Sequence, residues 1–414
     1  MSDWLGIDFG TSNSAAAYFH DGAIERVRFA DGQETIPTAV FFCFDRQVMD
    51  TGQAAHDAML DGLDGRYMRS LKRVLGTSLM SEQRMMIGRK LDFFDIVSDF
   101  LRRMKERAEA QAGRRFDKVV AGRPVLFDSN DAAKNARAGA DLEKCYRMAG
   151  FREVVFLPEP EAAAFSVDRA ISGNAPGVVV DIGGGTSDFT VFARHREGIE
   201  ITASSGIRIG GTDYDRALNL NFIMPHLGYR HPVRIAMSNE TISAPAGVFN
   251  ELATWEKIPF LYTPQTTTLV KSLVRDAIEP ARFRRLLHAI EGQLGHDIAL
   301  IAEDAKIRAN ESDRTTSVDL GLVERGLEAV ISPEAFHSVL DRFSARLTGT
   351  LDDLLRSTGI ARDEIAHVVP VGGSSLLRPV REAFSAALPN AEIVDAPIFT
   401  AIVDGLALHS ARMG

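Results

Sequence analysis

Cysteine is scarce in this chain, whose 414 residues include two, Cys43 and Cys145. Two cysteines so far apart are too few to indicate a disulfide framework or a zinc cluster. The ten histidines are scattered, without a metal-ligand spacing such as H-E-x-x-H. The composition therefore argues against a disulfide-rich secreted scaffold or a zinc enzyme of that type, and it favours a reduced, cytoplasmic setting.

Positive charge is also in short supply, and long apolar runs are missing. The chain has 47 Lys and Arg against 56 Asp and Glu, a formal net charge of -9. A non-specific nucleic-acid binder would carry a basic excess, so we expect no nucleic-acid partner. The N-terminus lacks a basic start followed by an apolar run, and no window holds about 18 uncharged apolar residues. We therefore expect neither export nor a membrane span.

What the sequence does contain is an alternation of helical and extended patterns over a chain long enough for roughly two to three domains. Hydrophobic spacing predicts long helices and short strands in turn, which is typical of α/β layering. The hydrophobic pattern of 213–280 is mixed, and no helix or strand can be assigned from it. The predicted helices are 94–113, 129–150, 159–171, 282–311 and 333–358, and the predicted strands include 117–127, 154–158 and, with a turn, 315–328.

A β-hairpin with a side-chain-free tip is predicted at "VVVDIGGGTSDFTVF", from Val178 to Phe192. Its flanks are β-branched and aromatic, whereas Gly183, Gly184 and Gly185 supply turn conformations that other residues tolerate poorly. Such a tip presents backbone N–H groups without steric cover and suits the approach of a phosphate chain. A glycine turn that binds nothing is the alternative for this segment taken alone.

The same pattern occurs earlier in the chain. When "IDFGTSNSAAAYF" is set under "VDIGGGTSDFTVF", Asp8 falls on Asp181 and Gly10 on Gly183, at an offset of 181 - 8 = 173 residues. Two copies of one hairpin predict two related lobes, with "SGNAPG" (172–177) as connector. A ligand held by both hairpins would lie in the cleft between the lobes.

Seven motifs, in order along the chain, carry a resemblance to a known family. They are "GIDFGTSNS", "SLKRVLG", "LPEPEAAA", "VVVDIGGGTSDFTVF", "IGGTDYDRAL", "EDAKI" and "VVPVGGSS". Together they resemble the nucleotide-binding domain of the Hsp70 chaperones, within the actin and sugar-kinase superfamily, and are closest in style to short Hsp70-like proteins of the YegD type, which share the "GRPV" at 122–125. The resemblance implies an actin-like ATPase fold of two related, ribonuclease H-like lobes with inserted subdomains and a central nucleotide cleft.

The lobes expected on this basis follow the repeat. Lobe I comprises residues 1–172, with 399–414 crossing back to it. Lobe II comprises 173–398, with an inserted subdomain near 214–302.

The resemblance also assigns catalytic and metal-binding roles. Asp8 and Asp181 end the first strands of the two hairpins, and a pair of carboxylates opposed across a polyphosphate suits hydrated Mg²⁺, which takes few protein ligands. By resemblance Lys72 positions the attacking water beside the γ-phosphate, and Glu159 orders the magnesium and water shell. Asp188 would help to hold the ions and water. A turn-capping aspartate, a solvated lysine and a helix N-terminal glutamate are the structural alternatives.

Nucleotide-binding positions follow in the same way. By resemblance the two hairpin turns contact the β- and γ-phosphates, and the later glycine turns and the "EDAKI" helix contact the ribose and base. The phosphate positions are Gly10, Thr11, Ser12, Gly183, Gly184, Gly185 and Thr186; the nucleoside positions are Gly210, Gly211, Glu303, Lys306, Gly372, Gly373 and Ser374.

Three positions depart from the family pattern at the base. The chaperones have arginines where this chain has Ile307 and Leu376, and an aspartate where it has Phe399. These substitutions predict an altered and more apolar base pocket. We therefore expect ATP or ADP to bind together with Mg²⁺, and we expect the phosphate chain to contribute more to binding than adenine does.

The function expected is slow hydrolysis of Mg-ATP, with lobe closure coupled to a protein partner or co-chaperone. The sequence shows no interdomain linker or peptide-binding domain after "LALHSARMG", so no client-binding module of its own is expected. Two alternatives remain: an ATP-dependent switch or scaffold that does not hydrolyse ATP, and a small-molecule kinase of the same fold.

Overall fold

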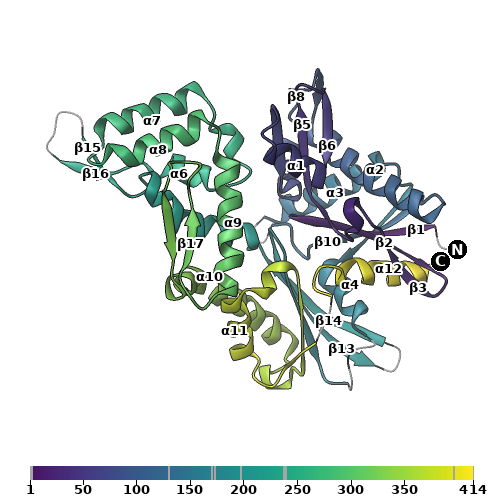
Figure 1. Ribbon diagram of the computed structural model, residues 1–414. Helices are drawn as coiled ribbons and strands as arrows, with labels where there is room; N and C mark the ends of the chain where they lie inside the picture. The colour runs from purple at the N-terminus through teal and green to yellow at the C-terminus, as the bar shows by residue number, and fades with distance from the viewer. Residues whose placement is uncertain are drawn as a thin grey trace. The chain divides into compact units, whose positions relative to one another are not determined.

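The computed structural model describes residues 3–128, 131–168, 171, 174–195, 198–235, 240–394 and 397–413 (Figure 1). Contacts divide the chain into two compact units. The first comprises Met1–Gly211 and Ala345–Gly414, and the second comprises Thr212–Ser344. Each is described separately below.

The first unit contains two large mixed sheets. One has the strand order β11-β10-β1-β2-β3, with β4 paired to β2. Strands β1, β10 and β11 run parallel, and β1, β2 and β3 form an antiparallel meander. The strands are β1 (Trp4–Phe9), β2 (Asn13–His20), β3 (Ala23–Arg26), β4 (Ile36–Pro37), β10 (Lys118–Arg123) and β11 (Glu153–Pro158).

The second sheet repeats this arrangement. Its order is β14-β13-β12-β19-β20, with β12, β19 and β20 parallel and β12, β13 and β14 antiparallel. The strands are β12 (Gly177–Ile182), β13 (Ser187–His195), β14 (Gly198–Ile207), β19 (His367–Val371) and β20 (Glu392–Ile393).

The two hairpins agree residue by residue in their backbone pairing. Phe9 pairs with Ser14 in the first hairpin, and Ile182 pairs with Ser187 in the second, which is the sequence offset of 173 applied to both partners. The next pairs inward, Asp8 with Ala15 and Asp181 with Asp188, keep the same relation. The predicted repeat of the hairpin is therefore confirmed.

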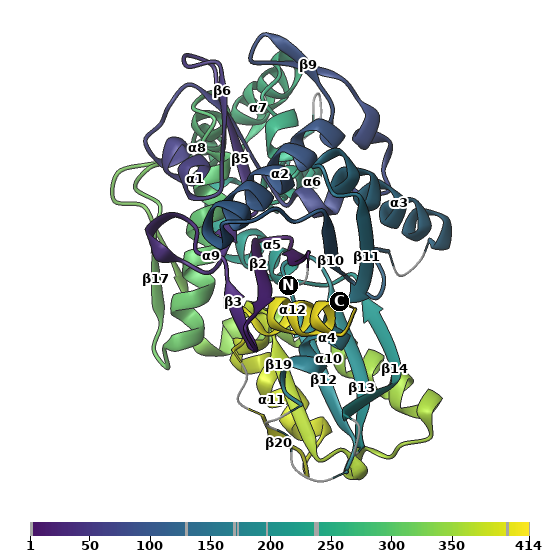
Figure 2. The same ribbon diagram turned by 90° about the vertical axis from the view of Figure 1, so that its right-hand side faces the viewer.

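Helices cover the first sheet on both faces (Figure 2). Helices α2 (Phe93–Ala112) and α3 (Ala132–Met148) pack against each other and touch β2 and β11 respectively. Helix α12 (Ala401–Met413) packs on β1, β2 and β10, while α4 (Glu159–Ser166) packs on α12 and touches β12 and β13 of the second sheet. One buried apolar cluster accordingly joins α4, α12 and the central strands of both sheets.

The α4–α12 crossing is unusually close. A Cβ on Gly405 would lie 1.7 Å from the carbonyl oxygen of Ala162, so only glycine permits this approach of the two backbones. The C-terminal helix thus fits directly between the β1 side of one sheet and the helix that contacts the other.

A smaller layer of the first unit surrounds α1 (Gln53–Leu60). The sheet β6-β5-β7 contacts this helix, and a separate hairpin pairs β8 with β9. The strands are β5 (Ala39–Cys43), β6 (Val48–Thr51), β7 (Gly65–Arg69), β8 (Arg84–Met86) and β9 (Arg89–Leu91).

The second unit is mainly helical. Among the residues described between α5 (Gly211–Leu218) and α10 (Pro333–Thr358), which cross its boundaries, are four α-helices and two pairs of short antiparallel strands. These are β15 (Pro232–Arg234), β16 (Thr241–Ser243), α6 (Ala246–Leu252), α7 (Pro264–Asp276), α8 (Pro280–Glu291), α9 (Gly295–Glu311), β17 (Thr316–Asp319) and β18 (Glu328–Ile331).

The prediction of a single helix over 282–311 is wrong. The chain forms α8 and α9, separated by a turn in which Gln293 adopts a left-handed φ of 54°. Gly292 directly before it has a right-handed φ of -83°, so the left-handed conformation that ends α8 falls on Gln293, which a pattern of apolar spacing alone does not reveal.

Two expectations fall outside the described residues. The helix start predicted at Ser129 is one, and α3 begins at Ala132 with Asp131 as its N-cap. The lobe boundary at 172/173 is the other. The contact-based units place both sheets together, so the two-lobe limits stay a prediction. No helix in the described part of the chain is long and apolar enough to cross a membrane.

Candidate functional site

The tips of the two repeated hairpins meet in the first unit. A Cβ on Gly184 would lie 2.3 Å from Oγ of Ser12, and one on Gly185 would lie 3.0 Å from Oγ1 of Thr11. The absence of side chains on these glycines therefore lets the two turns contact each other. In the first turn, a Cβ on Gly10 would lie 2.1 Å from the carbonyl oxygen of Asn13, which explains the glycine there.

A buried ion pair lies at the same place. Lys72, in the short 3-10 helix Leu71–Val74, places Nζ 2.5 Å from Oε1 of Glu159, the first residue of α4. Burial acts to lower the pKa of Lys72, but the carboxylates of Glu159 and Asp8 outweigh it and the net pKa is raised. Lys72 is therefore a buried cation and not a solvated helix lysine.

Three aspartates surround this pair. Burial raises the pKa of Asp8 to about 7 and the charge of Glu159 adds to the effect, while Lys72 opposes it. Burial and Glu159 likewise raise the pKa of Asp188 to about 7. The pKa of Asp181 is raised well above its usual range by burial, Glu159 and Asp188. Proximity of like charges in a desolvated site has this consequence.

A backbone contact that the sequence did not assign holds Asp188. Its Oδ1 accepts a hydrogen bond of 2.9 Å from the N–H of Val125, which follows β10. A Cβ on Gly206 would lie 2.4 Å from the same oxygen, so glycine there leaves room for the carboxylate. The "GRPV" segment is thus part of the site, although its sequence resembles an ordinary strand exit.

A third turn packs behind the second hairpin. The N–H of Gly211 donates to the carbonyl of Gly183 at 2.9 Å, and Oγ of Ser187 donates to the carbonyl of Ile209 at 2.7 Å. A Cβ on Gly210 would lie 2.5 Å from the backbone of Gly184 and Gly185. Gly210 and Gly211 therefore support the glycine turn from behind.

The turn after β19 reaches the same carboxylates. Gly372 has a left-handed φ of 77°, and a Cβ there would lie 2.4 Å from the carbonyl oxygen of Ile182 and 2.9 Å from Oδ1 of Asp181. Oγ of Ser374 would lie 2.7 Å from a Cβ on Gly211. The structure thus brings predicted residues from six of the seven motifs together in the first unit.

Two of the departures from the family pattern are exposed apolar side chains beside this turn. The Phe399 ring lies 3.2 Å from the Cβ position of Gly373, and 57% of Phe399 is exposed. Leu376 follows the same turn and is also exposed. Neither side chain offers a charge or a hydrogen-bond donor to a base.

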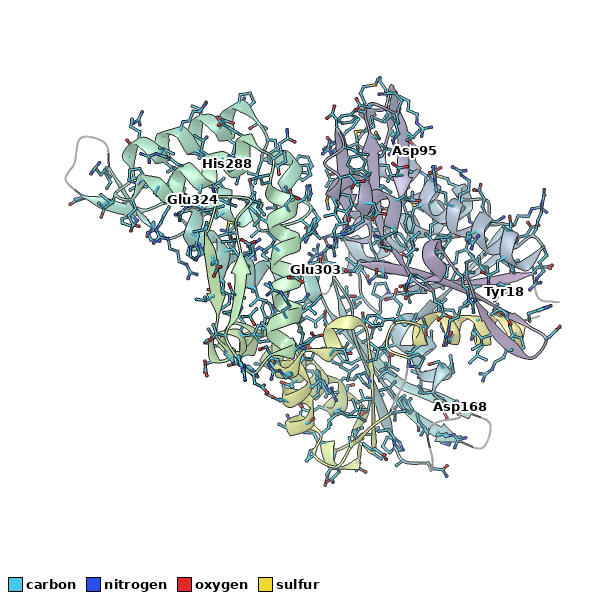
Figure 3. The ribbon with its side chains drawn as sticks, viewed as in Figure 1. Tyr18, Asp95, Asp168, His288, Glu303 and Glu324 are labelled. Carbon is cyan, nitrogen blue, oxygen red and sulfur yellow. The ribbon has the colours of Figure 1, made fainter. Side chains whose placement is uncertain are left out.

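The remaining nucleoside positions belong to the second unit. Glu303 lies on α9 (Figure 3). Lys306, one turn further on, pairs with Asp215 at 2.6 Å, and both side chains are buried. Asp215 was missed by the sequence reasoning, although its "DYD" motif follows the glycines. Ile307 is exposed on the same helix.

The carboxylates fit a cation, though not as a preformed cage. Among the described residues, no three Asp, Glu, His or Cys side chains converge as metal ligands. Magnesium keeps several waters and needs one or two carboxylates. If all four carboxyl groups of Asp8, Glu159, Asp181 and Asp188 were ionised, Lys72 would balance one charge in four. Burial and this mutual repulsion raise the pKa of the three aspartates, which a bound cation would lower again.

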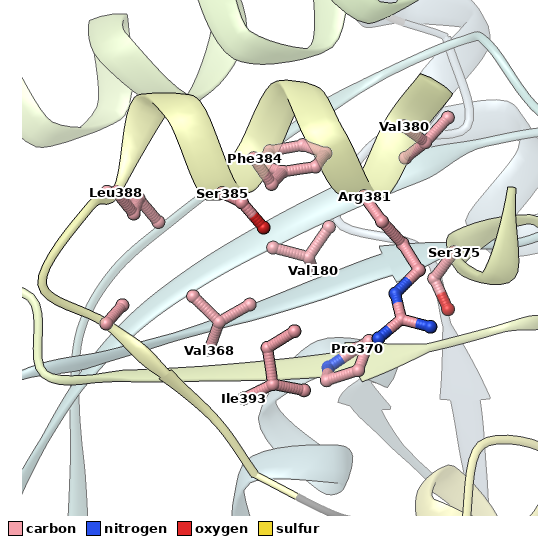
Figure 4. A pocket seen from close by; sticks show the side chains of 11 residues that line it. Val180, Val368, Pro370, Ser375, Val380, Arg381, Phe384, Ser385, Leu388 and Ile393 are labelled. Atoms are coloured by element: carbon pink, nitrogen blue, oxygen red, sulfur yellow. The ribbon is translucent and has the colours of Figure 1, made fainter. Parts of the chain in front are cut away.

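An apolar crevice lies on the far face of the second sheet, under α11 (Arg378–Ala387) (Figure 4). Val180, Val368 and Phe384 form its walls, and the exposed Arg381 stands at its mouth. Its lining carries no carboxylate, so it has none of the chemistry of the Lys72 cluster.

Comparison with known proteins gives a consistent result. The family profile described as "Hsp70 protein" matches residues 80–243. The chain is 29% identical over 406 residues to "Chaperone protein HscA homolog" of Pseudomonas putida, covering 92% of this chain and 53% of the relative. It is 28% identical over 301 residues to "Chaperone protein DnaK" of Thermotoga petrophila, covering 67% of this chain and 48% of the relative.

The chain spans about half the length of the curated relatives it matches. The matched family profile, these similarities and the duplicated hairpin sheets agree. The chain is therefore similar to the HscA and DnaK chaperones over most of its length, part of it matches the Hsp70 family profile, and it has the actin-like ATPase fold.

Proposed function

We propose that the protein binds Mg-ATP between the two glycine hairpins and hydrolyses it slowly to ADP and phosphate. The observation that carries the proposal is the buried Lys72–Glu159 pair among three aspartates, directly beside two turns that touch each other. A charged, desolvated cluster next to side-chain-free backbone is suited to polyphosphate chemistry.

In this proposal the turns of the two hairpins bind the phosphates of the nucleotide. The N–H groups and hydroxyls of Thr11, Ser12 and Thr186 are donors for phosphate oxygens, and the glycines allow the backbone to come close. Asp8 and Asp181 would hold the hydrated Mg²⁺, directly or through its waters. Bound Mg²⁺ neutralises phosphate charge and compensates the carboxylates.

Hydrolysis requires a water positioned in line with the γ-phosphate. The Lys72 ammonium, fixed by Glu159, is suited to orient that water and to stabilise the charge on the transferring phosphoryl group. As the oxygen of water bonds to phosphorus, the bond to the ADP oxygen breaks and the water gives up a proton. A carboxylate of the cluster such as Asp188, ionised once Mg²⁺ lies beside it, would accept this proton.

In this proposal the adenine base contributes less to the binding affinity than the triphosphate does. Exposed Leu376 and Phe399 can contact a base through apolar surface, but they cannot supply the cationic stems that arginines would. Affinity should therefore reside mostly in the triphosphate. A protein partner that senses the bound nucleotide is part of the proposal, by analogy with the chaperone relatives.

Single-turnover hydrolysis of γ-labelled ATP tests the proposal. With protein in excess and Mg²⁺ present, we expect labelled free phosphate at a rate above the protein-free background. Tight ATP binding without hydrolysis would replace it with a nucleotide-dependent switch. Transfer of the label to an added sugar would replace it with a kinase.

A further inference from the structure

The segment that carries Lys72 has a constrained backbone at both ends. Ser70 before it has a left-handed φ of 59°, which is uncommon for a residue with a side chain, and Ser70 is fully buried. Gly76 after it has a left-handed φ of 76°. A strained conformation of this kind persists only where the surrounding structure fixes it. The pair with Glu159 fixes the side chain of Lys72, so the backbone of the segment needs a support of its own.

Helix α3 contacts the end of this segment directly. The N–H of Gly76 donates a hydrogen bond of 2.9 Å to Oδ2 of Asp141, which lies on α3. The carbonyl oxygen of Gly76 accepts a second, longer bond of 3.4 Å from Nε of Arg137, one turn earlier on the same helix. Both backbone polar groups of Gly76 are therefore bound by side chains of α3.

The backbone of Gly76 also packs closely on this helix. A Cβ there would lie 2.6 Å from the carbonyl oxygen of Lys134 and 3.1 Å from Cβ of Ala138, which is fully buried. A side chain at position 76 would therefore push the segment away from α3. Glycine allows both the left-handed backbone and this close approach.

We propose that Asp141 is a positioning residue, which holds the segment 70–76 against α3 and so keeps Lys72 beside Glu159. It acts through the backbone of Gly76, four residues after Lys72. The short 3-10 helix Leu71–Val74 lies within the segment and carries Lys72. Only the consequence for hydrolysis rests on the proposed function.

That consequence concerns the rate of hydrolysis more than the binding of ATP. If Gly76 is released from α3, the backbone beneath Lys72 is less well fixed, whereas the glycine turns of the two hairpins keep their contacts. A small displacement of a catalytic group is enough to lower the rate of a reaction that depends on its orientation.

Amide hydrogen exchange of the ligand-free protein, measured by mass spectrometry, tests the contact without nucleotide. Asp141→Ala removes the acceptor, so we expect residues 70–77 to exchange about tenfold faster. Asp141→Asn should preserve their protection, because its amide oxygen can still accept from the N–H of Gly76. Glu143→Ala is the matched control, since Glu143 is a carboxylate of the same helix whose partner is the exposed Arg147, and it should leave the exchange of 70–77 unchanged.

Single-turnover hydrolysis of saturating Mg-ATP by the same variants tests the consequence. Asp141→Ala should lower the rate about tenfold and change the Kd for ATP by less than about threefold, because a displaced catalytic group affects the transition state more than the bound substrate. Asp141→Asn and Glu143→Ala should hydrolyse ATP like the unmodified protein. Alanine favours the helix, so α3 should still form in Asp141→Ala, and thermal melting checks that it does.

The proposal is overturned if residues 70–77 of Asp141→Ala exchange as in the unmodified protein. Faster exchange together with an unchanged rate of hydrolysis would make Asp141 a structural residue and would also contradict its positioning role. Failure of the ATPase proposal would look different. If the unmodified protein does not hydrolyse ATP, the proposed function is refuted, and the exchange experiment alone decides whether Asp141 holds the segment.

Discussion

The ammonium of Lys72 and the carboxylate of Glu159 are joined across 2.5 Å in a buried environment, although 87 residues separate them in sequence. The pair links the segment after β7 to the start of α4. Since α4 also touches the second sheet and α12, this one contact ties the chemistry of the site to the helices packed between the sheets.

Replacing Lys72 with Ala should separate catalysis from binding. The ammonium acts where charge develops during phosphoryl transfer, so we expect single-turnover hydrolysis to fall by a factor of about 10² to 10³. ATP affinity should stay within about tenfold, roughly 1.4 kcal/mol, because both glycine turns remain. The exposed Lys90→Ala is the control. Normal hydrolysis by the Lys72 variant would remove that residue from the mechanism.

Asp8→Asn and Asp181→Asn should each weaken Mg-ATP binding by a similar factor, because each removes one charge from the same ion shell. The ligand-free proteins should nevertheless melt at higher temperature than the unmodified chain, since burial and neighbouring carboxylates raise the pKa of both groups and their ionised forms destabilise the fold. Calorimetry and thermal unfolding measure the two effects. A binding loss confined to one aspartate would show that the hairpins do not share a site.

The raised pKa of Asp188 predicts a specific dependence of the free energy of unfolding on pH. Its pKa is about 7 in the folded chain against 3.8 as the reference for an unfolded one. At pH below 4 both states are protonated and Asp188 contributes nothing. Between pH 4 and 7 the unfolded state ionises first, so stability is lost as pH rises, up to about 4 kcal/mol, and the loss levels off above pH 7.

The substitution Asp188→Asn isolates this effect, because the amide oxygen can still accept the hydrogen bond from Val125. Urea unfolding without Mg²⁺ or nucleotide should show the variant gaining stability over the unmodified protein between pH 4 and 7. A difference that does not change with pH would contradict the assigned pKa.

Gly405→Ala should destabilise the first unit strongly. Its Cβ would lie 1.7 Å from the carbonyl oxygen of Ala162, so α12 and α4 would have to move apart. We expect a loss of about 2 kcal/mol or more in the free energy of unfolding. Gly139→Ala is the control, because it lies within α3 with open space at its Cβ, and it should stabilise by about 0.5–1 kcal/mol. Equal effects would refute the close packing of the two helices.

The sequence predicts those parts of the fold that depend on local residue patterns better than those that depend on a single backbone conformation or on distant contacts. The hairpins were predictable because β-branched and aromatic flanks, three glycines and the constant offset to Asp8 specify strand, turn and repeat within a short segment. The break between α8 and α9 was not predicted, because the residue that adopts the left-handed φ is Gln293, while the neighbouring Gly292 stays right-handed.

The same limit applies to predicting the candidate site from the sequence. Lys72 and Glu159 were found through motifs, but their direct pairing depends on how η2 (Leu71–Val74) and α4 pack. The N–H of Val125 that holds Asp188 is a backbone group, so no residue type marks it. The hydrogen bond from Gly76 to Asp141 joins the segment after Lys72 to helix α3, and nothing in the sequence places the two together.

The most direct test of Mg-ATP binding among these carboxylates is to measure the protons released when it binds. Asp8 and Asp188, with pKa values of about 7 in the ligand-free chain, are mostly protonated at pH 6, and a cation beside them should lower both pKa values. Calorimetric titration of preformed Mg-ATP in buffers of different ionisation enthalpy should therefore show net proton release at pH 6. The release that comes from Asp8 and Asp188 should disappear above about pH 8, so the net release should fall, and Asp188→Asn should reduce the release at pH 6. Binding without proton release at pH 6, or no binding at all, would contradict the assignment of this cluster as the nucleotide site.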